Sequence, residues 1–387
     1  MELRKLRQEN EIIDLFCNLA EIPSPSRREE KVIEWICNYC KTNNLQYELD
    51  DYKNIYINIP ATDETKDPIL LSSHLDVIGD DSPVIPYLDG DLIRAKGRTL
   101  GADDKAGVAN ALYFATALNK RTDLKHGGLE VHFTRDEEDS MTGIKNTDFN
   151  KIHSKYVLVL DSDALGQCLT SGASYVMVDL KVNAPKGGHS GNDIGDNTRE
   201  NAAKLIADLV SSLPQGVYYS EDEKVITSCN IGGIVSGDVK VTNVINTDAH
   251  ATYSIRSSNK EKEDELIELM TDIVDNFNSE YEGIAKAEIN FNVKMPMFEK
   301  NKDEYLPILF ETVARKVGVE PEISSFHAGA ETHIYANKTN AKGEIFSPYL
   351  IGLATVCNMH SASEYVDYKT MLKGQELLKE LFEAYNK

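Results

Sequence analysis

Features that mark membrane and secreted proteins are missing from this sequence. Nowhere does it contain a run of about 18 apolar residues, so we expect no membrane-spanning helix and no membrane partner. The first residues, MELRKLRQENEII, are charged and have no apolar segment of the length that a signal peptide needs. We therefore expect a cytoplasmic protein.

Basic residues and cysteines are also scarce. Lys and Arg number 41 against 63 Asp and Glu, and the resulting net charge of -22 repels a phosphate backbone, so we expect no nucleic-acid partner. Six cysteines in so long a chain do not make a disulfide scaffold. Cys37 and Cys40 form a C-x-x-C, but they recur at helical spacing with neighbouring apolar residues, which predicts a buried helix face rather than a redox or zinc site.

The chain is long enough for more than one domain. Its 387 residues suggest two, and 41% of them are hydrophobic. Near residue 172 the order of predicted elements changes to βαββαβ, which is typical of a small α+β sandwich. We therefore predict a catalytic α/β domain formed by residues 1–172 and 296–387, with residues 173–295 inserted as a second domain.

Local patterns predict several individual elements. Apolar repeats predict one helix over residues 3–20, and Ser26 and Glu29 have the spacing of a capping box for the helix that follows. Residues 45–60 alternate as strands do, 68–73 form a short apolar strand, and a last helix follows Asp367.

Polar residues follow several of the predicted strands at their carboxyl ends. His74 and Asp76 come after the apolar strand 68–73, Glu137 and Glu138 follow a second strand, and Asp161 follows a third. In open α/β sheets, ligands bind outside the carboxyl ends of the strands. Each motif also has a plainer interpretation, because H-x-D is a common polar strand end and acids on an exposed surface carry no function.

A second motif, Leu100-Gly-Ala-Asp-Asp-Lys-Ala-Gly107, opens a predicted helix. The helix dipole favours acids at this position, but it does not explain the glycines on both sides. A carboxylate here has an oxygen for each of two cations. Of the paired glutamates, one would then bind metal while its neighbour acts as a general base. His360, in a polar loop before the last helix, would complete the set, although alone it is an ordinary loop histidine.

Taken in order, these motifs resemble the co-catalytic zinc metallopeptidase family that includes peptidase T, carboxypeptidase G, succinyl-diaminopimelate desuccinylase and the aminoacylases. The segment 100–107 is most similar to that of peptidase T, and the resemblance covers nearly the whole chain. It implies an α/β protein with a mixed-sheet zinc-peptidase catalytic domain and an inserted α+β sandwich that serves as a lid and dimerisation domain.

The resemblance also implies a role for each motif. It implies two zinc ions per chain, with cobalt or manganese as alternatives, and a cis peptide bond between Asp103 and Asp104. The implied metal ligands are His74 and Asp161 for one ion, Glu138 and His360 for the other, and Asp103 as the bridge. Asp76 would orient His74, and Glu137 would take a proton from the attacking water and pass it to the leaving amine.

In the inserted domain, the resemblance implies substrate contacts for His189, Asn243 and Arg256, with His189 often acting across a homodimer interface. The plainer interpretations are a turn residue for His189 and a surface charge for Arg256. The segment His327-Ala-Gly-Ala-Glu331-Thr-His333 departs from the family pattern. These three residues have no implied metal role and are candidates for lining the substrate pocket.

We therefore expect an enzyme that removes the N-terminal residue of short peptides, most similar to tripeptide aminopeptidases of the peptidase T type. Alternatives of the same chemistry are an N-acyl amino acid deacylase and a carboxypeptidase. Two further alternatives are a non-catalytic binding protein on this fold and a protein with a single or structural metal ion.

Overall fold

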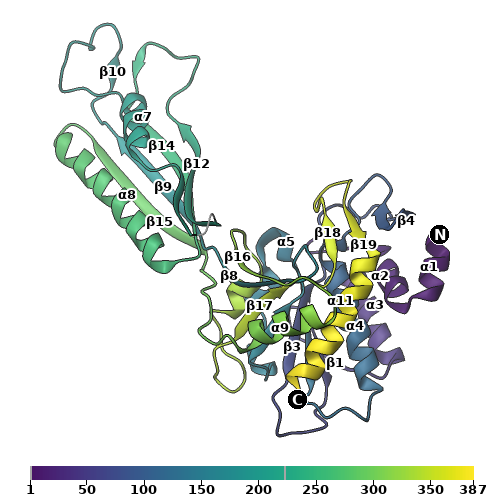
Figure 1. Cartoon of the computed structure of the whole chain (residues 1–387). Coiled ribbons are helices and arrows are strands. Elements are labelled where there is room, and N and C mark those ends of the chain that lie inside the picture. Colours follow the sequence, from purple (N-terminus) through teal and green to yellow (C-terminus); the bar gives the residue numbers. More distant parts are fainter. Residues whose placement is uncertain (1, 222–223) are drawn as a thin grey trace. The chain divides into compact units, whose positions relative to one another are not determined.

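The computed structural model describes residues 2–221 and 224–387 and divides the chain into two compact units. The larger unit comprises residues 1–170, 300–325 and 330–387, and the smaller comprises residues 171–299 and 326–329. Figure 1 labels many of their elements. Among the described residues, no helix is both long enough and apolar enough to cross a membrane.

The larger unit is built on an eight-stranded mixed sheet in the order β1-β2-β6-β3-β7-β17-β8-β16. The central strands β6, β3, β7 and β17 are parallel, while β2 and β8 run antiparallel to their neighbours β6 and β17. The strands are β1 (Gln46–Leu49), β2 (Ile55–Ile59), β3 (Ile69–His74), β6 (Leu129–Thr134), β7 (Tyr156–Val159), β8 (Gln167–Gly172), β16 (Glu322–Phe326) and β17 (Ser347–Ile351). All six residues of β3 are buried, as expected for a central parallel strand.

Helices cover this sheet and supply much of its core. They are α1 (Leu3–Glu9), α2 (Glu11–Ala20), α3 (Glu30–Thr42), α4 (Ala102–Asn119), α5 (Glu137–Ser140), α6 (Thr142–Lys145), α9 (Tyr305–Lys316), α10 (Thr332–Tyr335) and α11 (Tyr368–Tyr385), with a 3₁₀ turn η1 (Phe149–Lys151). A second sheet has the order β18-β19-β5-β4, formed by β4 (Pro86–Asp89), β5 (Leu92–Ala95), β18 (Thr355–Cys357) and β19 (Tyr365–Asp367).

The smaller unit is a five-stranded antiparallel sheet, in the order β11-β12-β14-β9-β15, packed against two helices. Its elements are β9 (Tyr175–Asn183), β10 (Gly188–His189), α7 (Ala202–Ser212), β11 (Gly216–Glu221), β12 (Lys224–Val235), β13 (Val244–Ile245), β14 (Asp248–Ser257), α8 (Lys260–Glu280) and β15 (Lys286–Met295). Alternate residues of β9, such as Val178 and Leu180, are buried with Leu266 and Met270 of α8. The other face of the sheet is half-buried or exposed.

Three local expectations were wrong. Residues 3–20 form two helices rather than one, because Asn10 has an extended backbone between α1 and α2. Ser26 and Glu29 do not form a capping box: the N-cap of α3 is Glu29, with no side-chain cap, and the Ser26 hydroxyl bonds to Asp76 instead. The smaller sheet has an additional edge strand, β11, that the βαββαβ pattern omitted.

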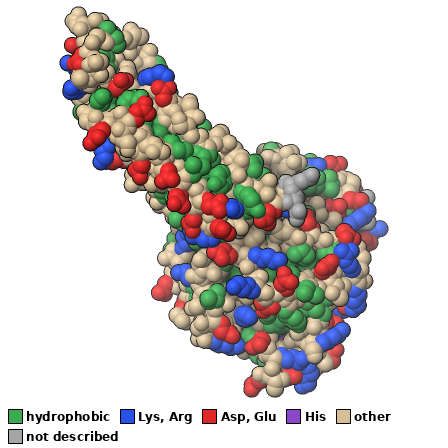
Figure 2. Space-filling view, turned by 60° about the vertical axis from the view of Figure 1, so that its left-hand side comes forward, with side chains coloured by type: hydrophobic (Ala, Val, Ile, Leu, Met, Phe, Trp, Pro, Cys, Tyr) green, Lys and Arg blue, Asp and Glu red, His purple; other side chains and the backbone are tan. Residues whose placement is uncertain are grey.

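Other local expectations are confirmed. Cys37 and Cys40 lie on the buried face of α3, and all six cysteines are free. The last helix, α11, follows Asp367, whose carboxylate caps it. On the face drawn in Figure 2, acidic and basic side chains are interspersed over the larger unit.

Candidate metal centre and catalytic site

Three neighbouring parallel strands bring the candidate residues to one edge of the large sheet. The order β6-β3-β7 places the carboxyl ends of these strands side by side. β3 ends on His74, β6 leads through a short turn to Glu137 and Glu138, and Asp161 lies just beyond the end of β7. Residues distant in the sequence therefore converge because of strand order and direction.

Asp103 lies at the centre of this group, between two histidines. Its Oδ1 is 3.2 Å from Nε2 of His74, and its Oδ2 is 3.1 Å from Nε2 of His360. Each histidine also faces a second carboxylate. Asp161 is 3.6 Å from His74, and Glu138 is 3.0 Å from His360. The structure thus brings together all five residues that the motifs suggested as ligands.

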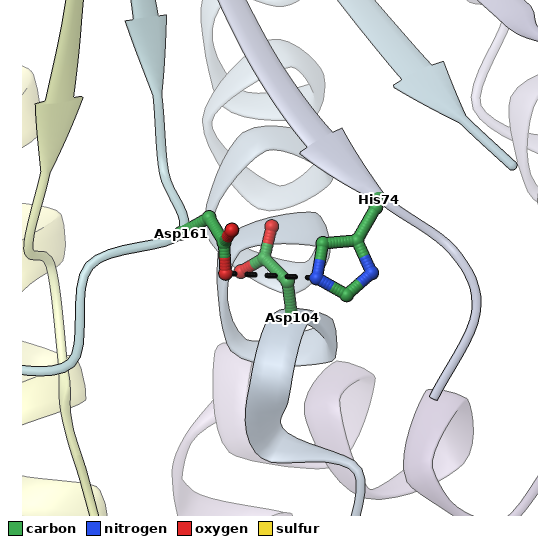
Figure 3. Close-up of side chains that lie close together, drawn as sticks. All are labelled: His74, Asp104 and Asp161. Carbon is green, nitrogen blue, oxygen red and sulfur yellow. Dashed lines mark ion pairs between the residues drawn. The ribbon is translucent and has the colours of Figure 1, made fainter. Parts of the chain in front are cut away.

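Asp104 is a further acid at the site, and the sequence had not suggested a contact for it. A ligand atom of Asp104 lies within 4.8 Å of atoms of His74 and Asp161, and Figure 3 shows these three side chains turned toward one another. Its Oδ1 accepts a hydrogen bond from the Gly107 amide in the first turn of α4. Burial, together with the charge of Asp161, raises its pKa well above the usual value. The peptide bond between Asp103 and Asp104 is cis, as the resemblance implied.

A fully buried carboxylate, Asp76, organises both the histidine and the glutamate turn. It accepts hydrogen bonds from the Glu137 amide at 2.9 Å and the Glu138 amide at 3.1 Å. Its Oδ1 is also 3.3 Å from Nδ1 of His74. Burial opposes its ionisation, but hydrogen bonds and the charge of His74 lower the pKa of Asp76 overall. The Ser26 hydroxyl, which donates to Asp76 at 2.7 Å, adds to this effect.

The neighbours Glu137 and Glu138 have different surroundings. Glu138 faces His360 with one oxygen, while its other oxygen is buried and lacks a hydrogen-bond partner in the described part of the chain. Burial raises the pKa of Glu138 to about 7. Burial also raises the pKa of Glu137 well above its usual value, and the nearby charge of Asp161 adds to this, although His74 opposes it.

A second carboxylate that sequence reasoning missed, Glu364, fixes the backbone around Asp103. It is buried and accepts hydrogen bonds from the amides of Gly101 and Ala102 at 2.8 Å and of Asp103 at 3.2 Å. Glu364 lies only four residues after His360, so one loop supplies both a candidate ligand and this anchor. Its nearness to His360 could have drawn attention to Glu364 in the sequence. The backbone that it binds, however, is more than 260 residues away in the chain.

The donor set fits a pair of divalent cations. Four-coordinate zinc with bonds of about 2.0–2.1 Å holds neighbouring donor atoms about 3.3 Å apart, and the four separations around Asp103 run from 3.0 to 3.6 Å. Two imidazoles meet five carboxylates here, which leaves negative charge that no group in the described part of the chain neutralises. These carboxylates are Asp103, Asp104, Glu137, Glu138 and Asp161. The adjacent Lys105 forms no ion pair with these carboxylates among the described residues, and its side chain donates to the Ile22 carbonyl.

The expected substrate residues all lie in the smaller unit, but not together. His189 and Asn243 are on adjoining segments, because the Ser190 amide donates to the Asn243 carbonyl beside the β10–β13 pair. Arg256 is near the end of β14 that pairs with the start of β9, whereas His189 follows the end of β9. The nine residues of β9 span about 30 Å at ~3.3 Å per residue.

The three residues that were candidates for lining the substrate pocket lie in different places. His327 belongs to the smaller unit, whereas Glu331 and His333 belong to the larger one. Glu331 is 1% exposed, and burial raises its pKa to about 7. The ring of His333 is fully buried and bonds through Nδ1 to the backbone of Ala330, so it turns inward to the protein.

Comparisons with known proteins identify the family of the chain. A family model described as peptidase family M20/M25/M40 matches residues 70–384. The cytosol non-specific dipeptidase of Escherichia coli (strain K12) is 27% identical over 331 residues, covering 77% of this chain and 65% of that protein. The chain therefore spans less than two thirds of the dipeptidase. Peptidase T of Listeria monocytogenes serotype 4b (strain CLIP80459) is 24% identical, covering 98% of this chain and 88% of that protein.

Among solved structures, the aminopeptidase PepT from Bacillus cereus ATCC 10987 has a similar fold. It superposes with a TM-score of 0.85 and covers 97% of this chain and 98% of its own, at 22% sequence identity.

Proposed function

The chain belongs to peptidase family M20/M25/M40 and is a metallopeptidase, and from this premise we propose that it is an aminopeptidase that removes the N-terminal residue of short peptides, tripeptides above all. The relatives named peptidase T support this reaction, and the expected cytoplasmic location suits the breakdown of small peptides. The observation that carries the proposal is the position of Asp103, whose two oxygens each face a histidine and lie beside a second carboxylate.

We propose that this arrangement holds two divalent ions, zinc by preference and cobalt or manganese as alternatives. In this proposal His74 and Asp161 bind one ion, Glu138 and His360 bind the other, and Asp103 bridges them. Such ions, when bound, lower the pKa of the attacking water and polarise the scissile carbonyl.

Glu137 is the proposed general base. It follows the end of β6, and its amide donates to Asp76, which fixes the turn. The side chain itself makes no hydrogen bond to the described part of the chain. It takes a proton from the attacking water and passes it to the leaving amine. A base must be ionised, and cations bound among the neighbouring carboxylates would bring down the pKa that burial raises. Asp76 holds His74 in the orientation that presents Nε2 to the site.

The smaller unit is proposed to bind substrate and to form a homodimer. Arg256 offers a planar fork that matches a peptide carboxylate. His189 and Asn243 lie beyond the far end of β9, so we propose that they serve a different contact from Arg256, with His189 acting across the dimer interface. Light scattering that gives the mass of a single chain at working concentration would contradict the dimer.

A dipeptidase is the second candidate, because the Escherichia coli relative is a dipeptidase. A panel of a tripeptide, a dipeptide and an N-acetyl amino acid separates the possibilities by their values of kcat/KM. The proposal predicts the tripeptide as the best substrate, with release of its N-terminal residue. Faster hydrolysis of the N-acetyl compound would contradict an aminopeptidase, and release of the C-terminal residue would identify a carboxypeptidase.

A further inference from the structure

Four side chains of the smaller unit form a cluster at one end of its sheet. Ser228 of β12 is paired directly opposite Arg256 of β14. The Arg256 guanidinium carbon lies 4.8 Å from the centre of the Tyr175 ring on β9. His327, from the segment 326–329 that belongs to the same unit, places Nε2 2.7 Å from the Ser228 hydroxyl. The sequence had made His327 a candidate for lining the substrate pocket and had assigned no role to Ser228 or Tyr175.

Arg256 has hydrogen-bonding capacity that its neighbours do not use. Within residues 2–221 and 224–387, no ion pair or hydrogen bond engages its guanidinium, although the residue is half-buried. Stacking on an aromatic ring uses the flat face of a guanidinium and leaves the N–H groups at its edge free. A half-buried, unpaired fork of this kind matches the geometry of a carboxylate.

His327 offers a further donor beside this fork. Its Nδ1 is buried and has no hydrogen-bond partner among the described residues. Burial lowers the pKa of His327, and the charge of Arg256 lowers it further, which favours the neutral ring. A neutral imidazole carries one N–H. When the Ser228 hydroxyl donates to Nε2, the proton resides on Nδ1, which then becomes a donor.

We propose that His327 and Arg256 together bind the terminal carboxylate of the peptide substrate, with Ser228 holding His327 in the donating tautomer. This rests on the proposed peptidase function and adds a specificity-determining residue to it. A carboxylate has lone pairs enough to accept two N–H bonds from the guanidinium and a third from Nδ1. The pair therefore selects peptides with a free C-terminus over peptides whose C-terminus is an amide.

Binding without turnover tests the proposal independently of catalysis. The probes are a tripeptide analogue whose first peptide carbonyl is replaced by CH₂, prepared with a free C-terminal carboxylate and as the C-terminal amide. Calorimetry on the metal-loaded protein measures both dissociation constants. Loss of a hydrogen bond to a charged group typically weakens binding by about 10- to 100-fold. His327→Ala should weaken binding of the acid by that factor and leave binding of the amide within about twofold.

Companion variants separate recognition from folding. Ser228→Ala should also weaken binding of the free-acid analogue, but by a smaller factor than His327→Ala does. His327→Asn, which restores an N–H donor, should recover part of the affinity that His327→Ala loses. His250→Ala is the matched control, because this histidine lies on the same sheet face but pairs with Asp179. It should leave the preference for the acid unchanged.

Two outcomes overturn the inference: wild-type protein that binds acid and amide equally, or His327→Ala that weakens both probes alike. Failure of the proposed function is seen separately. Protein that prefers the acid through His327 but cleaves no peptide retains the carboxylate site and loses the aminopeptidase assignment.

Discussion

Glu137 and Glu138 are adjacent, chemically identical residues with different surroundings, and we propose different tasks for them. Both amides donate to Asp76, so one carboxylate fixes the direction of both side chains. Glu138 lies beside His360 and Asp103, whereas no ion pair joins Glu137 to either histidine in the described part of the chain. The account assigns metal binding to the first and proton transfer to the second.

Replacing Glu137 by Gln tests that division of roles. The amide keeps the shape of the side chain but cannot accept a proton, so kcat should fall by about 10²- to 10⁴-fold while the bound metal content stays the same. Steady-state kinetics and elemental analysis of the purified variant measure the two quantities.

Asp139→Asn is the matched control, because Asp139 is the next residue and is half exposed in an ion pair with Arg27. It should keep near-normal turnover. Wild-type kcat in the Glu137→Gln variant would refute the base assignment.

At the level of elements, the loop that enters α4 depends on an anchor from the other end of the chain. Four groups of residues 99–103 donate to Glu364, which is buried. This contact fixes the backbone of Asp103, the residue that faces both histidines. The loop geometry is therefore set by a tertiary contact rather than by local sequence.

Glu364→Gln should damage both stability and the metal site. The introduced NH₂ faces backbone N–H groups, and an unsatisfied buried donor costs about 1–3 kcal/mol in free energy of unfolding. Because such anchors orient ligands, metal affinity should fall by about 10- to 100-fold. Denaturant unfolding and metal titration measure the two effects. The exposed Glu376→Gln is the control, and equal metal affinity in both variants would argue against the anchoring role.

A second element, β6, carries a buried histidine that makes stability depend on pH. His132 is fully buried with Nδ1 2.6 Å from the Tyr335 hydroxyl, and burial lowers its pKa to about 3. Since the unfolded chain binds a proton near pH 6.5 and the folded one does not, this contribution is present above pH 6.5. It is lost as the pH falls toward 3.

Lowering the pH from 7 to 4.5 should therefore cost about 2–3 kcal/mol of unfolding free energy through His132 alone. In His132→Gln that part of the acid dependence should disappear, even though the variant is less stable at pH 7. His153→Gln, which removes an exposed histidine, should keep it. Urea unfolding at the two pH values makes the comparison, and identical acid dependence in wild type and His132→Gln would show that His132 is not responsible.

The elements differ in how well sequence alone specified them. Strands β3 and β7 were predictable because short apolar runs ending in acids are typical of central parallel strands, and this placed His74 and Asp161 at the same edge. The break at Asn10 was not predictable, because the apolar spacing continues through it. The edge strand β11 was not predictable either, because few of its side chains are buried. Asp104 and Glu364 were missed since their contacts form only when distant segments pack.

For the molecule as a whole, the family resemblance and the fold class expected from the order of motifs are confirmed by the family match and by the PepT structure. The assignment of single residues to metal or substrate remains a proposal that rests on geometry within each unit. Within the larger unit, strands from residues 69–159 and a loop near residue 360 meet at one site. The candidate site therefore needs both ends of the chain.

The metal content of the intact protein tests the two-ion account most directly. Elemental analysis of active, purified protein, with Asp103→Ala beside it, counts ions per chain. The account predicts two divalent ions per chain in the wild type and loss of at least one in the variant, since Asp103 faces both halves of the site. A fully active wild-type protein that holds a single ion per chain, or an Asp103→Ala variant that keeps two, would contradict it.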